Sequence, residues 1–323
     1  MDYEKTVSVV VLNWNGKRFI DSFLKTLSKQ TYNYKNIELI FTDNDSSDNS
    51  VEYFNKAIKK INIKHKLVQN DKNYGYAGGN NRGMRHASGD YILVCNNDLE
   101  LDPNLVAELL KVAVAKRAAV TVPKLMYLKK QGFINNAGSR IDETSDWPIY
   151  EIGANENDNG QYNEIREITA FCGACVLFSR EFLKNVGVFD EKFFMYFEDG
   201  DLSWRGQKAG STFYYAPKAV ALHYHTGTSK EGSPLFNHFV GRNRILILTK
   251  NGKLKPLVHA WLKTLNDHIL LRIKRLIMSL ANKYPKRLAI NEFWLSQKMI
   301  WDALLLTPYV IAKRVRLIKE ETL

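Results

Sequence analysis

The sequence predicts an α/β fold in which a mostly parallel central sheet is flanked by helices, followed by a C-terminal helical region. Three observations lead to this fold class. Short apolar runs rich in β-branched residues alternate with segments of helical periodicity through about the first hundred residues. Polar clusters follow the apolar runs. From about residue 235 onward the apolar spacing is helical to the end of the chain.

The alternation begins near the N-terminus. Val7 to Leu12 is a continuous apolar run, typical of a strand that is buried on both faces of a parallel sheet. Lys17 to Lys29 has its apolar residues at helical spacing, Ile37 to Phe41 predicts the second strand, and Val51 to Ile61 predicts the second helix. Right-handed crossovers through these helices make the strands parallel.

The same pattern continues through a short strand at Leu67 and Val68, a glycine-rich turn into a helix from Tyr74 to Ala87, and a strand from Tyr91 to Cys95. Residues 127 to 165 are rich in Asn, Gly, Asp and Glu and have little periodicity. They predict a long, mobile connection near the site. Phe171 to Phe178 is small and apolar, which predicts a further strand.

Cysteine content and hydropathy bear on location. Three cysteines are too few for a disulfide framework, which favours a reducing compartment. Cys172 and Cys175 form a C-x-x-C pair, but they lie in a predicted strand and not at a helix start, so we interpret both as packing residues. The N-terminus has no secretory signal, and no stretch reaches the roughly 18 to 20 apolar residues that span a bilayer. We therefore expect a cytoplasmic protein.

Two polar clusters suit a nucleotide at the carboxyl ends of the strands. Asp43 follows the second strand, where a carboxylate can accept a base imide or a ribose hydroxyl, although Asp and Ser also favour turns and helix caps. The segment from Asn73 to Gly83 is rich in glycine, which permits close backbone approach and would place backbone donors and Arg82 near a phosphate. It lacks the G-x-G-x-x-G spacing of dinucleotide-binding dehydrogenases.

Two further clusters carry carboxylates. Asn96, Asn97 and Asp98 end a strand, where oxygen ligands could hold a hard cation such as Mn²⁺ or Mg²⁺ while substrate phosphates and waters complete the shell. The alternative is that Asp98 is a turn residue. Glu198 and Asp199 lie at the start of a helix predicted to run to about Ala209, where they could cap the helix or supply a general base.

In this order the motifs resemble family 2 glycosyltransferases of the GT-A fold, most of all the rhamnosyltransferase-like members of bacteria and archaea. The likeness covers roughly residues 6 to 250. The motifs that carry it are Asn13-Trp14-Asn15-Gly16, Thr42 to Asp48, Asn73 to Gly83, Asn96-Asn97-Asp98, Cys172 to Arg180, Val186 to Glu191 and Phe197 to Leu202.

The resemblance implies an inverting, metal-dependent transfer of a sugar from a nucleotide-diphosphate donor. Asp199 matches the catalytic base of the Glu198–Asp199 pair, and Asp98 with Asn96 takes the place of a metal-binding D-x-D, to which His223 or His225 adds a ligand. Many relatives have Asp at the position of Asn96. The residues that the resemblance implies for the donor site are Asn13, Asn15, Asp43, Asn73, Gly78, Gly79, Asn80, Arg82, Asn96 and Asn97.

Likeness to this branch also implies the substrates. The first expectation for the donor is dTDP-rhamnose and the second is a UDP-sugar. The acceptor would be a glycan or a lipid-linked oligosaccharide in cell-surface polysaccharide synthesis. A catalytically silent nucleotide-sugar-binding scaffold of the same fold is the rival interpretation, which the intact Asp98 and Asp199 disfavour. A nucleotidyltransferase would need a basic phosphate-activating signature that Asn13 to Gly16 does not supply.

The C-terminal region is basic and amphipathic. The chain has a net charge of +12, and residues 251 to 323 hold 14 Lys and Arg against 5 Asp and Glu. Basic residues such as Lys263 and Arg272 flank an apolar helix face, and Trp294 and Trp301 fit an interfacial anchor on anionic lipid at the inner face of the cell membrane. A packed helical subdomain or a dimer interface is the alternative. Nucleic-acid binding is disfavoured because the first 250 residues carry little net charge.

These observations predict three regions. Residues 1–98 would form the nucleotide-sugar-binding half and residues 99–235 the acceptor-binding, catalytic half of one GT-A domain. Residues 236–323 would form the basic helical region.

Overall fold

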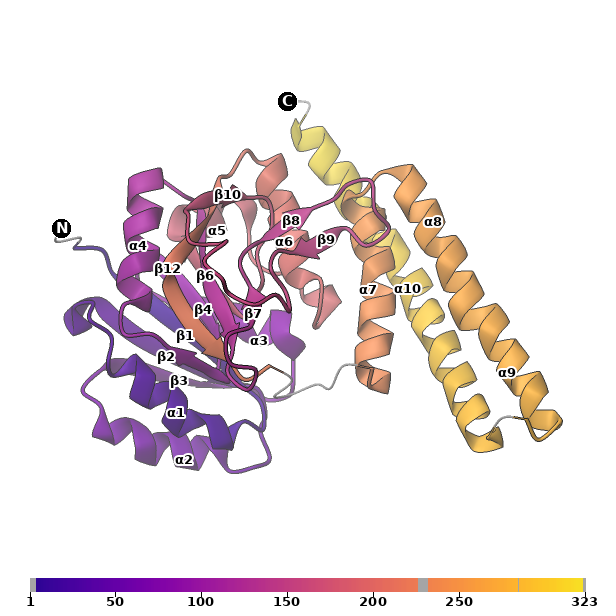
Figure 1. Ribbon diagram of the computed structural model, residues 1–323, viewed down its shortest axis with the longest axis horizontal. Coiled ribbons are helices and arrows are strands. Elements are labelled where there is room, and N and C mark those ends of the chain that lie inside the picture. Colours follow the sequence, from indigo (N-terminus) through magenta and orange to yellow (C-terminus); the bar gives the residue numbers. More distant parts are fainter. Residues whose placement is uncertain (1–3, 226–231, 284, 322–323) are drawn as a thin grey trace. The chain divides into compact units, whose positions relative to one another are not determined.

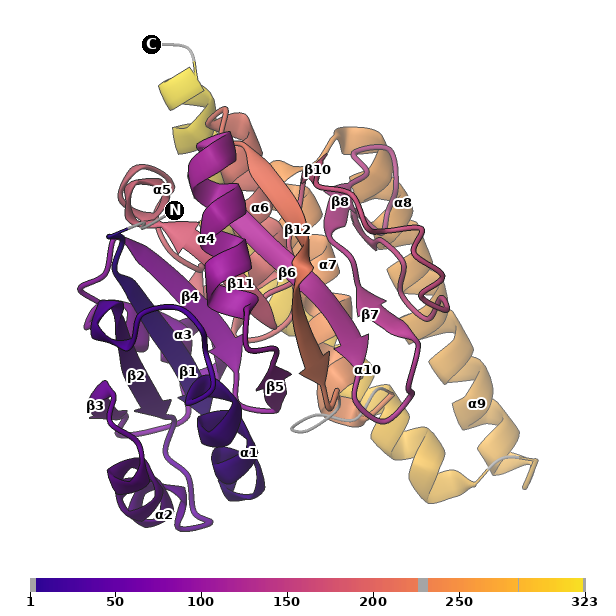
Figure 2. The same ribbon diagram turned by 60° about the vertical axis from the view of Figure 1, so that its left-hand side comes forward.

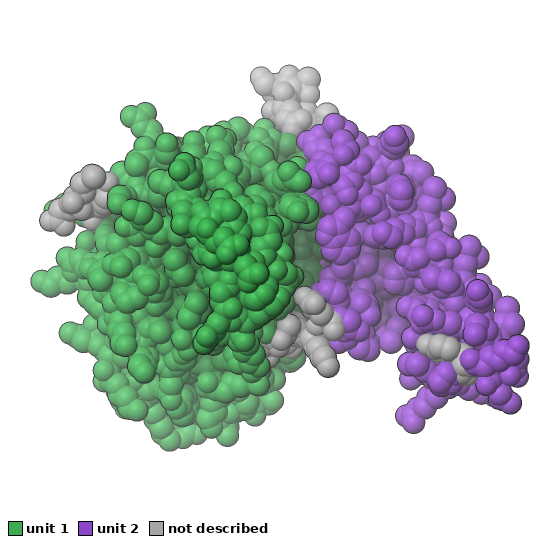
Figure 3. Space-filling view, viewed as in Figure 1, with its two compact units in different colours: residues 1–141, 149–228 green, residues 142–148, 229–323 purple. Residues whose placement is uncertain are grey.

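The computed structural model describes residues 4–225, 232–283 and 285–321, with side chains as far as residue 315. The chain divides into two compact units, one formed by residues 1–141 and 149–228 and the other by residues 142–148 and 229–323 (Figure 3).

Within the described residues, ten strands of the first unit form one mixed sheet (Figure 1). They are β1 Val7–Asn13, β2 Ile37–Asp43, β3 Lys64–Gln69, β4 Tyr91–Asn96, β5 Leu99–Leu101, β6 Val120–Tyr127, β7 Ile134–Asn136, β10 Arg166–Ile168, β11 Cys175–Ser179 and β12 Phe213–His223. The main order is β10-β12-β6-β11-β4-β1-β2-β3, with β5 beside β12 and β7 beside β6. The strands β1 to β4 run parallel, which confirms the predicted parallel sheet in this half.

Helices cover both faces of this sheet. They are α1 Lys17–Leu27, α2 Ser50–Ala57, α3 Gly75–Met84, α4 Leu105–Lys116, α5 Arg180–Val186 and α6 Glu198–Lys208. The helices α1, α2 and α4 pack on one face, which includes Val9 and Val11 of β1, whereas α3, α5 and α6 share a core with Val10. Figure 2 shows α1 and α4 in front of the strands. This alternation along β1 explains why the run reads as continuously apolar.

The segment from residue 127 to 165 differs from its prediction as a mobile connection. It holds β7, which pairs with β6, and a separate hairpin of β8 Ser139–Ile141 and β9 Ile149–Glu151. Each of these strands is three residues long. A strand of that length is too short to show a clear period of two, so composition alone indicated a loop.

One other element boundary was also predicted wrongly. The strand expected at Phe171 begins only at Cys175, because residues 173–174 form a turn before β11 enters the sheet. After Asp98, Leu99–Leu101 forms a strand against β12, and α4 begins at Leu105. Cys95 and Cys175 lie opposite each other on β4 and β11 as free thiols, with their Sγ atoms 3.7 Å apart.

The second unit is helical, as predicted. It contains α7 Pro234–Asn251, α8 Leu254–Leu265, a π-helical turn Asn266–Leu270, α9 Leu271–Leu280 and α10 Lys286–Glu321. Residues 142–148 join it through ion pairs of Arg244 with Asp146 and Lys253 with Glu143, at 3.5 and 2.9 Å. Of the helices that the structure describes, none has the length and apolar character to cross a membrane.

Glu38 on β2 offers a test of the energetics of the sheet. Its carboxylate accepts hydrogen bonds from Ser8 Oγ, Ser88 N and Ser88 Oγ at 2.5, 2.6 and 2.7 Å and pairs with Lys64 Nζ at 2.9 Å. Burial raises the pKa of Glu38, but these hydrogen bonds outweigh burial and lower it to about 2. We expect Glu38→Gln to lower the free energy of unfolding at neutral pH by about 2 kcal/mol, measured by urea denaturation.

The pH dependence gives the control. Because the folded pKa is depressed, the stabilisation by Glu38 is complete above its ordinary pKa of 4.5 and is lost as the pH falls through about 2. The difference between the native protein and Glu38→Gln should therefore shrink in acid. Glu52→Gln removes an exposed pair with Lys56 and should change little at any pH. A constant difference down to pH 2 would contradict this account of Glu38.

Candidate active site

Asn13, at the end of β1, joins two neighbouring strand ends. Its Nδ2 donates to Asp43 Oδ1 at 3.0 Å and to Ser46 Oγ at 3.1 Å, and its Oδ1 accepts from Asn97 Nδ2 at 2.7 Å. Asn13 is directly opposite Asp43 in the register of β1 and β2. All three predicted residues are buried, so the structure brings Asn13, Asp43 and Asn97 together.

The turn after β1 is fastened to the loop after β2. Asn15 N donates to Ser46 Oγ at 2.9 Å, Asn15 Oδ1 accepts from Ser47 N at 2.8 Å, and Ser46 N donates to Asp43 Oδ2 at 2.9 Å. A Cβ at Gly16 would lie 2.1 Å from Asn97 Nδ2, so only glycine allows this close approach. Ser46 bridges both loops and was not among the predicted residues.

Asn44 ties the end of β2 to the start of α3. It is 1% exposed. Its Nδ2 donates to Asn73 Oδ1 at 2.8 Å and Gly75 O at 3.1 Å, while its Oδ1 accepts from Asn70 Nδ2 at 3.0 Å and Tyr74 N at 3.1 Å. Asn73 therefore acts through Asn44 in positioning the glycine-rich segment. Sequence reasoning missed Asn44, which looked like one more turn residue.

The glycines of α3 allow the helix to lie close to β1. A Cβ at Gly79 would lie 2.5 Å from Leu12 Cδ1, and one at Gly78 would lie 2.9 Å from Tyr74 Cβ. Asn80 Nδ2 donates to Tyr76 O at 3.0 Å, while its buried Oδ1 has no hydrogen-bond partner within the described part of the chain. These positions serve helix packing in addition to any contact with a donor.

Arg82 is held on the surface of α3. Its guanidinium lies 3.2 Å from the centroid of the Tyr74 ring, and its Nη1 donates to Gly78 O at 3.1 Å. It also pairs with Glu191 at 3.5 Å. A phosphate contact by Arg82 would have to compete with Glu191.

Asp98 and His223 form a buried pair. Asp98 follows β4, and the antiparallel pairing of β5 with β12 sets Leu99 opposite His223. His223 Nε2 lies 3.3 Å from Asp98 Oδ1, and the two residues are 7% and 8% exposed. His225, the alternative ligand, instead packs edge-on against His223 and Tyr127. The geometry therefore favours His223.

The residues around Asp98 fit a divalent cation. Among the described residues, no group of three or more His, Cys, Asp or Glu side chains could hold a metal. Asp98 and His223 supply one oxygen and one nitrogen donor, and Asn96 ends β4, the strand that leads to Asp98. Mn²⁺ or Mg²⁺ accepts so few protein ligands where substrate phosphates and waters complete the shell. This donor set suits a cation that binds together with a diphosphate.

Asp199 and Glu198 begin α6. Asp199 Oδ2 accepts from Gly173 N at 2.9 Å and Asp199 Oδ1 from Gly200 N at 2.7 Å. Glu198 is 5% exposed, and no described residue forms a hydrogen bond with its Oε2. Phe194, Tyr196 and Phe197 precede the pair with φ values of 66°, 67° and 66°. Left-handed backbone at three aromatic residues is strained, as often occurs beside active sites.

The carboxylate pair is linked to the end of β4. Asn96 N donates to Ala174 O at 2.9 Å, and the adjacent Gly173 N donates to Asp199. The Tyr76 hydroxyl donates to Gly173 O at 2.5 Å, which adds α3 to the same junction. The turn at residues 173–174 thus connects the predicted base with the strand that leads to Asp98.

Burial dominates the electrostatics of this pair. It raises the pKa of Glu198 well above its ordinary value, and the charge of Asp199 raises it further. Burial also raises the pKa of Asp199, against the hydrogen bonds from Gly173 N and Gly200 N. The pair therefore keeps a proton to a higher pH than isolated carboxyl groups would.

A stability measurement tests this electrostatic account. Because the folded pKa of Glu198 is raised, its contribution to stability is complete below its ordinary pKa of 4.5 and is lost as the pH rises through the folded pKa. Glu198→Gln removes the buried charge. We expect its melting temperature, relative to the native protein, to rise between pH 5 and pH 8. A relative melting temperature that is the same at both pH values would argue against a buried, proton-retaining Glu198.

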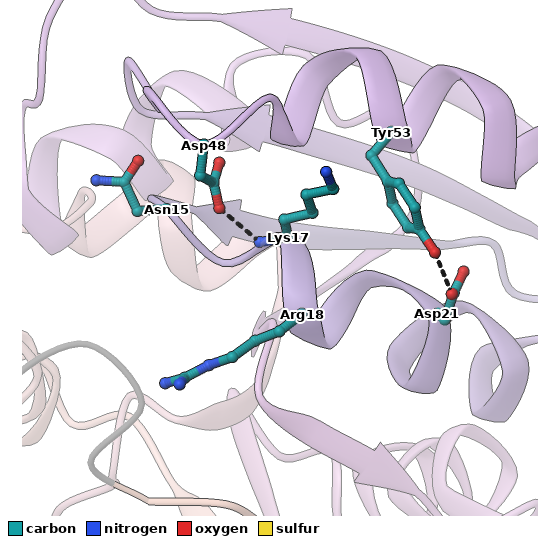
Figure 4. Close-up of a pocket in the computed structure, with 6 residues that line it drawn as sticks. All are labelled: Asn15, Lys17, Arg18, Asp21, Asp48 and Tyr53. Atoms are coloured by element: carbon teal, nitrogen blue, oxygen red, sulfur yellow. Dashed lines mark hydrogen bonds between the residues drawn. The ribbon is translucent and has the colours of Figure 1, made fainter.

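An open surface pocket of about 570 Å³ adjoins the donor loops at the start of α1 (Figure 4). Lys17 extends toward Tyr53, whose hydroxyl donates to Asp21, and Arg18 points away from them. Asp48 Oδ2 accepts from Lys17 N at 2.9 Å and its Oδ1 from Ser50 N at 3.1 Å, so Asp48 holds the start of α1 and of α2. Asn15 is the predicted site residue that lines this pocket.

The family model of glycosyl transferase family 2 matches residues 8–187. This match covers more than half of the chain. The chain belongs to glycosyltransferase family 2.

This glycosyltransferase is similar in sequence to proteins named as sugar transferases. It is 22% identical to the low-salt glycan biosynthesis hexosyltransferase Agl10 of Haloferax volcanii over 67% of this chain and 66% of that protein. It is 25% identical to an N-acetylglucosaminyl-diphospho-decaprenol L-rhamnosyltransferase of Mycobacterium tuberculosis over 67% of this chain and 75% of that protein.

The fold of the glycosyltransferase is also found among solved structures. A mannosyltransferase from Pyrobaculum calidifontis, in complex with GDP-Man and Mn²⁺, aligns with a TM-score of 0.58 and 16% identity. The alignment covers 95% of this chain and 88% of that one. Together with the family match and the mostly parallel sheet, this confirms the predicted GT-A fold. The roles of all the predicted site residues remain predictions, and Glu198, Asp199 and His223 lie beyond the end of the family match.

Proposed function

We propose that this glycosyltransferase moves a sugar from a nucleotide-diphosphate donor to an acceptor hydroxyl with inversion, using Asp199 as the general base. The observation that carries the proposal is the hydrogen-bonded junction at residues 173–174, which joins Asp199 to Asn96 at the end of β4. A base close to the end of that strand can reach an acceptor beside a donor bound over β1, β2 and β4.

In this mechanism Asp199 takes the proton of the acceptor hydroxyl as its oxygen attacks the anomeric carbon. The bond from that carbon to the diphosphate breaks on the opposite face, so one displacement inverts the configuration. Burial raises the pKa of Glu198, so Glu198 keeps its proton to a higher pH than an exposed glutamate and limits the negative charge beside Asp199. Asp98 and His223 would hold Mn²⁺ or Mg²⁺ with Asn96 nearby, and the cation would stabilise the charge that forms on the departing diphosphate.

Asn13, Asn15, Asp43, Asn96 and Asn97 bind the donor in this proposal. Asp43 accepts a hydrogen bond from the nucleobase or the ribose of the donor. The amide side chains shape the site through the hydrogen bonds with Asn13. The glycine-rich segment forms the border of the donor site in this proposal, with Asn73, Gly78, Gly79, Asn80 and Arg82.

The first candidate for the donor is dTDP-rhamnose, supported by the rhamnosyltransferase-like motifs and the mycobacterial relative. A UDP-sugar is the second candidate. The acceptor is a glycan or a lipid-linked oligosaccharide in cell-surface polysaccharide synthesis, supported by the names of both relatives.

A donor panel tests these proposals. Purified protein with Mn²⁺ or Mg²⁺ is combined with dTDP-rhamnose, UDP-glucose, UDP-N-acetylglucosamine and GDP-mannose, and thermal shift and release of nucleotide diphosphate are followed. A metal-dependent rise in melting temperature with one donor identifies the sugar and the nucleobase. Binding without transfer to any acceptor would favour the silent scaffold, and no response to any of them would contradict the donor proposal.

We further propose that the second unit binds the anionic inner surface of the cell membrane. Large apolar side chains of α8 and α9 are exposed, among them Leu262 and Ile277, each 62% exposed. On α10 Trp294 and Trp301 are 66% and 64% exposed. Exposed apolar side chains among basic residues such as Lys263 favour insertion at an anionic lipid interface.

Partitioning onto vesicles tests the membrane proposal. We expect the double variant Leu262→Asp, Ile277→Asp to bind vesicles of anionic phospholipid at least about tenfold more weakly in a sedimentation assay, because two apolar insertions worth about 1.5 kcal/mol or more each are lost. Val188→Asp, which replaces an exposed apolar residue of the first unit, is the matched control. Equal vesicle binding by the native protein and the double variant, or no binding by the native protein, would argue for a protein interface instead.

A further inference from the structure

His223 is held by Asn135, a residue of the segment that was predicted to be a mobile connection. His223 Nδ1 lies 2.8 Å from Asn135 Oδ1. An amide oxygen can only accept a hydrogen bond, so the imidazole must carry its hydrogen on Nδ1. In the neutral ring Nε2 then has a free lone pair.

That lone pair faces a carboxylate. His223 Nε2 lies 3.3 Å from Asp98 Oδ1, and both atoms are acceptors when the ring is neutral with hydrogen on Nδ1. Asn135, His223 and Asp98 are 6%, 7% and 8% exposed, so little water can separate them. Two facing acceptors in a buried site repel each other, so this arrangement of the neutral ring and the carboxylate suits a cation that both atoms share.

Asn135 occupies an irregular position in its strand. In the pairing of β7 with β6, Asn136 is opposite Leu125 and Ile134 is opposite Met126. Asn135 is therefore the extra residue of a β-bulge. Bulges redirect a side chain near active sites, and this one lies beside β6, whose Tyr127 is opposite His223 on β12.

We propose that Asn135 is a positioning residue that fixes the tautomer and orientation of His223, so that Nε2 faces a divalent cation shared with Asp98. This inference rests on the metal site of the proposed function. Without the amide oxygen, the hydrogen would move to Nε2 and form an ordinary hydrogen bond to Asp98. That bond would occupy the two donor atoms that a cation needs. Asn135 thus keeps the pair open for metal.

Two measurements test this role without an activity assay. The first is Mn²⁺ affinity, obtained from the electron paramagnetic resonance signal of free Mn²⁺ in titrations without nucleotide and with dTDP or UDP. The second is the ¹⁵N shifts of the His223 ring, assigned with His223→Ala. The variants are Asn135→Leu, which keeps the branched shape at Cγ but not the acceptor, and Asn135→Asp, which keeps the acceptor.

We expect Asn135→Leu to weaken Mn²⁺ binding about tenfold or more and to move the ring hydrogen to Nε2. Asn135→Asp should retain both the affinity and the Nδ1–H tautomer. In a His223→Ala background, Asn135→Leu should change Mn²⁺ affinity less than about twofold, because the residue acts through the imidazole.

The outcomes separate this inference from the proposed function. A Mn²⁺ site that is lost in Asp98→Ala but unaffected by Asn135→Leu would overturn the role of Asn135 and leave the metal site standing. An equal loss in the His223→Ala background would show that Asn135 is only structural. Failure of the native protein to bind Mn²⁺ in the presence of either dTDP or UDP would overturn the metal site and this inference together.

Discussion

Asp199→Asn should reduce kcat by between about a hundredfold and ten-thousandfold while KM for the donor changes little. The loss is the contribution of a positioned general base, since asparagine keeps the shape and the hydrogen bonds from Gly173 N and Gly200 N in part but cannot accept the proton. Initial rates of nucleotide diphosphate release measure it, with circular dichroism to confirm folding.

The pH profile adds a second signature. Burial raises the pKa of Asp199, so the native protein should gain activity with rising pH through an apparent pKa above the ordinary 3.8 of an aspartate. The residual activity of Asp199→Asn should lack this acid limb. A variant that keeps both the rate and the limb would assign the base to another residue.

Asp201→Asn is the matched control, because it makes the same change two positions further along α6. Asp201 is fully buried and pairs with Arg205 at 3.0 Å. Removing one partner of a buried pair destabilises the fold, so this variant should show a lower melting temperature. Its kcat should stay within about threefold of native. Equal losses of kcat in both variants would mean that α6 as a whole had been disturbed.

Asp98→Ala should lower the metal-dependent rate by about a hundredfold or more. A cation that stabilises the charge on the leaving diphosphate is worth several kcal/mol, and each 1.36 kcal/mol is about a factor of ten in rate. Initial rates across a series of Mn²⁺ concentrations measure the effect. Thermal stabilisation by the donor nucleotide diphosphate with Mn²⁺ should also disappear.

The chelated native protein provides the comparison for this variant. If Asp98 acts through the cation, native protein in EDTA and Asp98→Ala with Mn²⁺ should have similar residual rates. Asp102→Ala removes a carboxylate four positions further on, which accepts from Asn104 N ahead of α4. It should lower stability by about 1 kcal/mol and keep the metal dependence. An Asp98→Ala enzyme that still responds fully to Mn²⁺ would rule out this ligand.

The donor loops were predictable because a parallel sheet brings its strand ends together. Once Val7 to Leu12 and Ile37 to Phe41 were recognised as buried parallel strands, Asn13 and Asp43 had to be neighbours. The side chains that organise the site were less accessible. Asn44 makes four hydrogen bonds to residues 26 to 31 positions away, and no local pattern encodes such long-range contacts.

Asn135 illustrates a second limit. It lies at a bulge in a strand of three residues, where neither propensity nor alternation gives a signal. Asn135 reaches His223 through β6, which pairs antiparallel with β7 and parallel with β12, and the pairing of β6 with β12 joins segments far apart in the sequence. The part of the site built on β1, β2 and β4 was thus derivable from local sequence, whereas the contact of Asn135 with His223 through β6, β7 and β12 required the structure.

The π-helical turn at Asn266–Leu270 constrains the number of residues between the exposed apolar rows of α8 and α9. Exposed apolar residues of α8 recur every three or four positions at Leu254, Val258, Leu262 and Leu265. A second row with the same spacing begins at Leu270, the last residue of the π turn, and continues on α9 at Ile273, Ile277 and Leu280. The step from Leu265 to Leu270 is five residues. A π turn accommodates one residue more than an α turn, so both rows keep the same azimuth. Loss of a single residue here would rotate one row by about 100° from the other, which makes this turn intolerant of insertions and deletions.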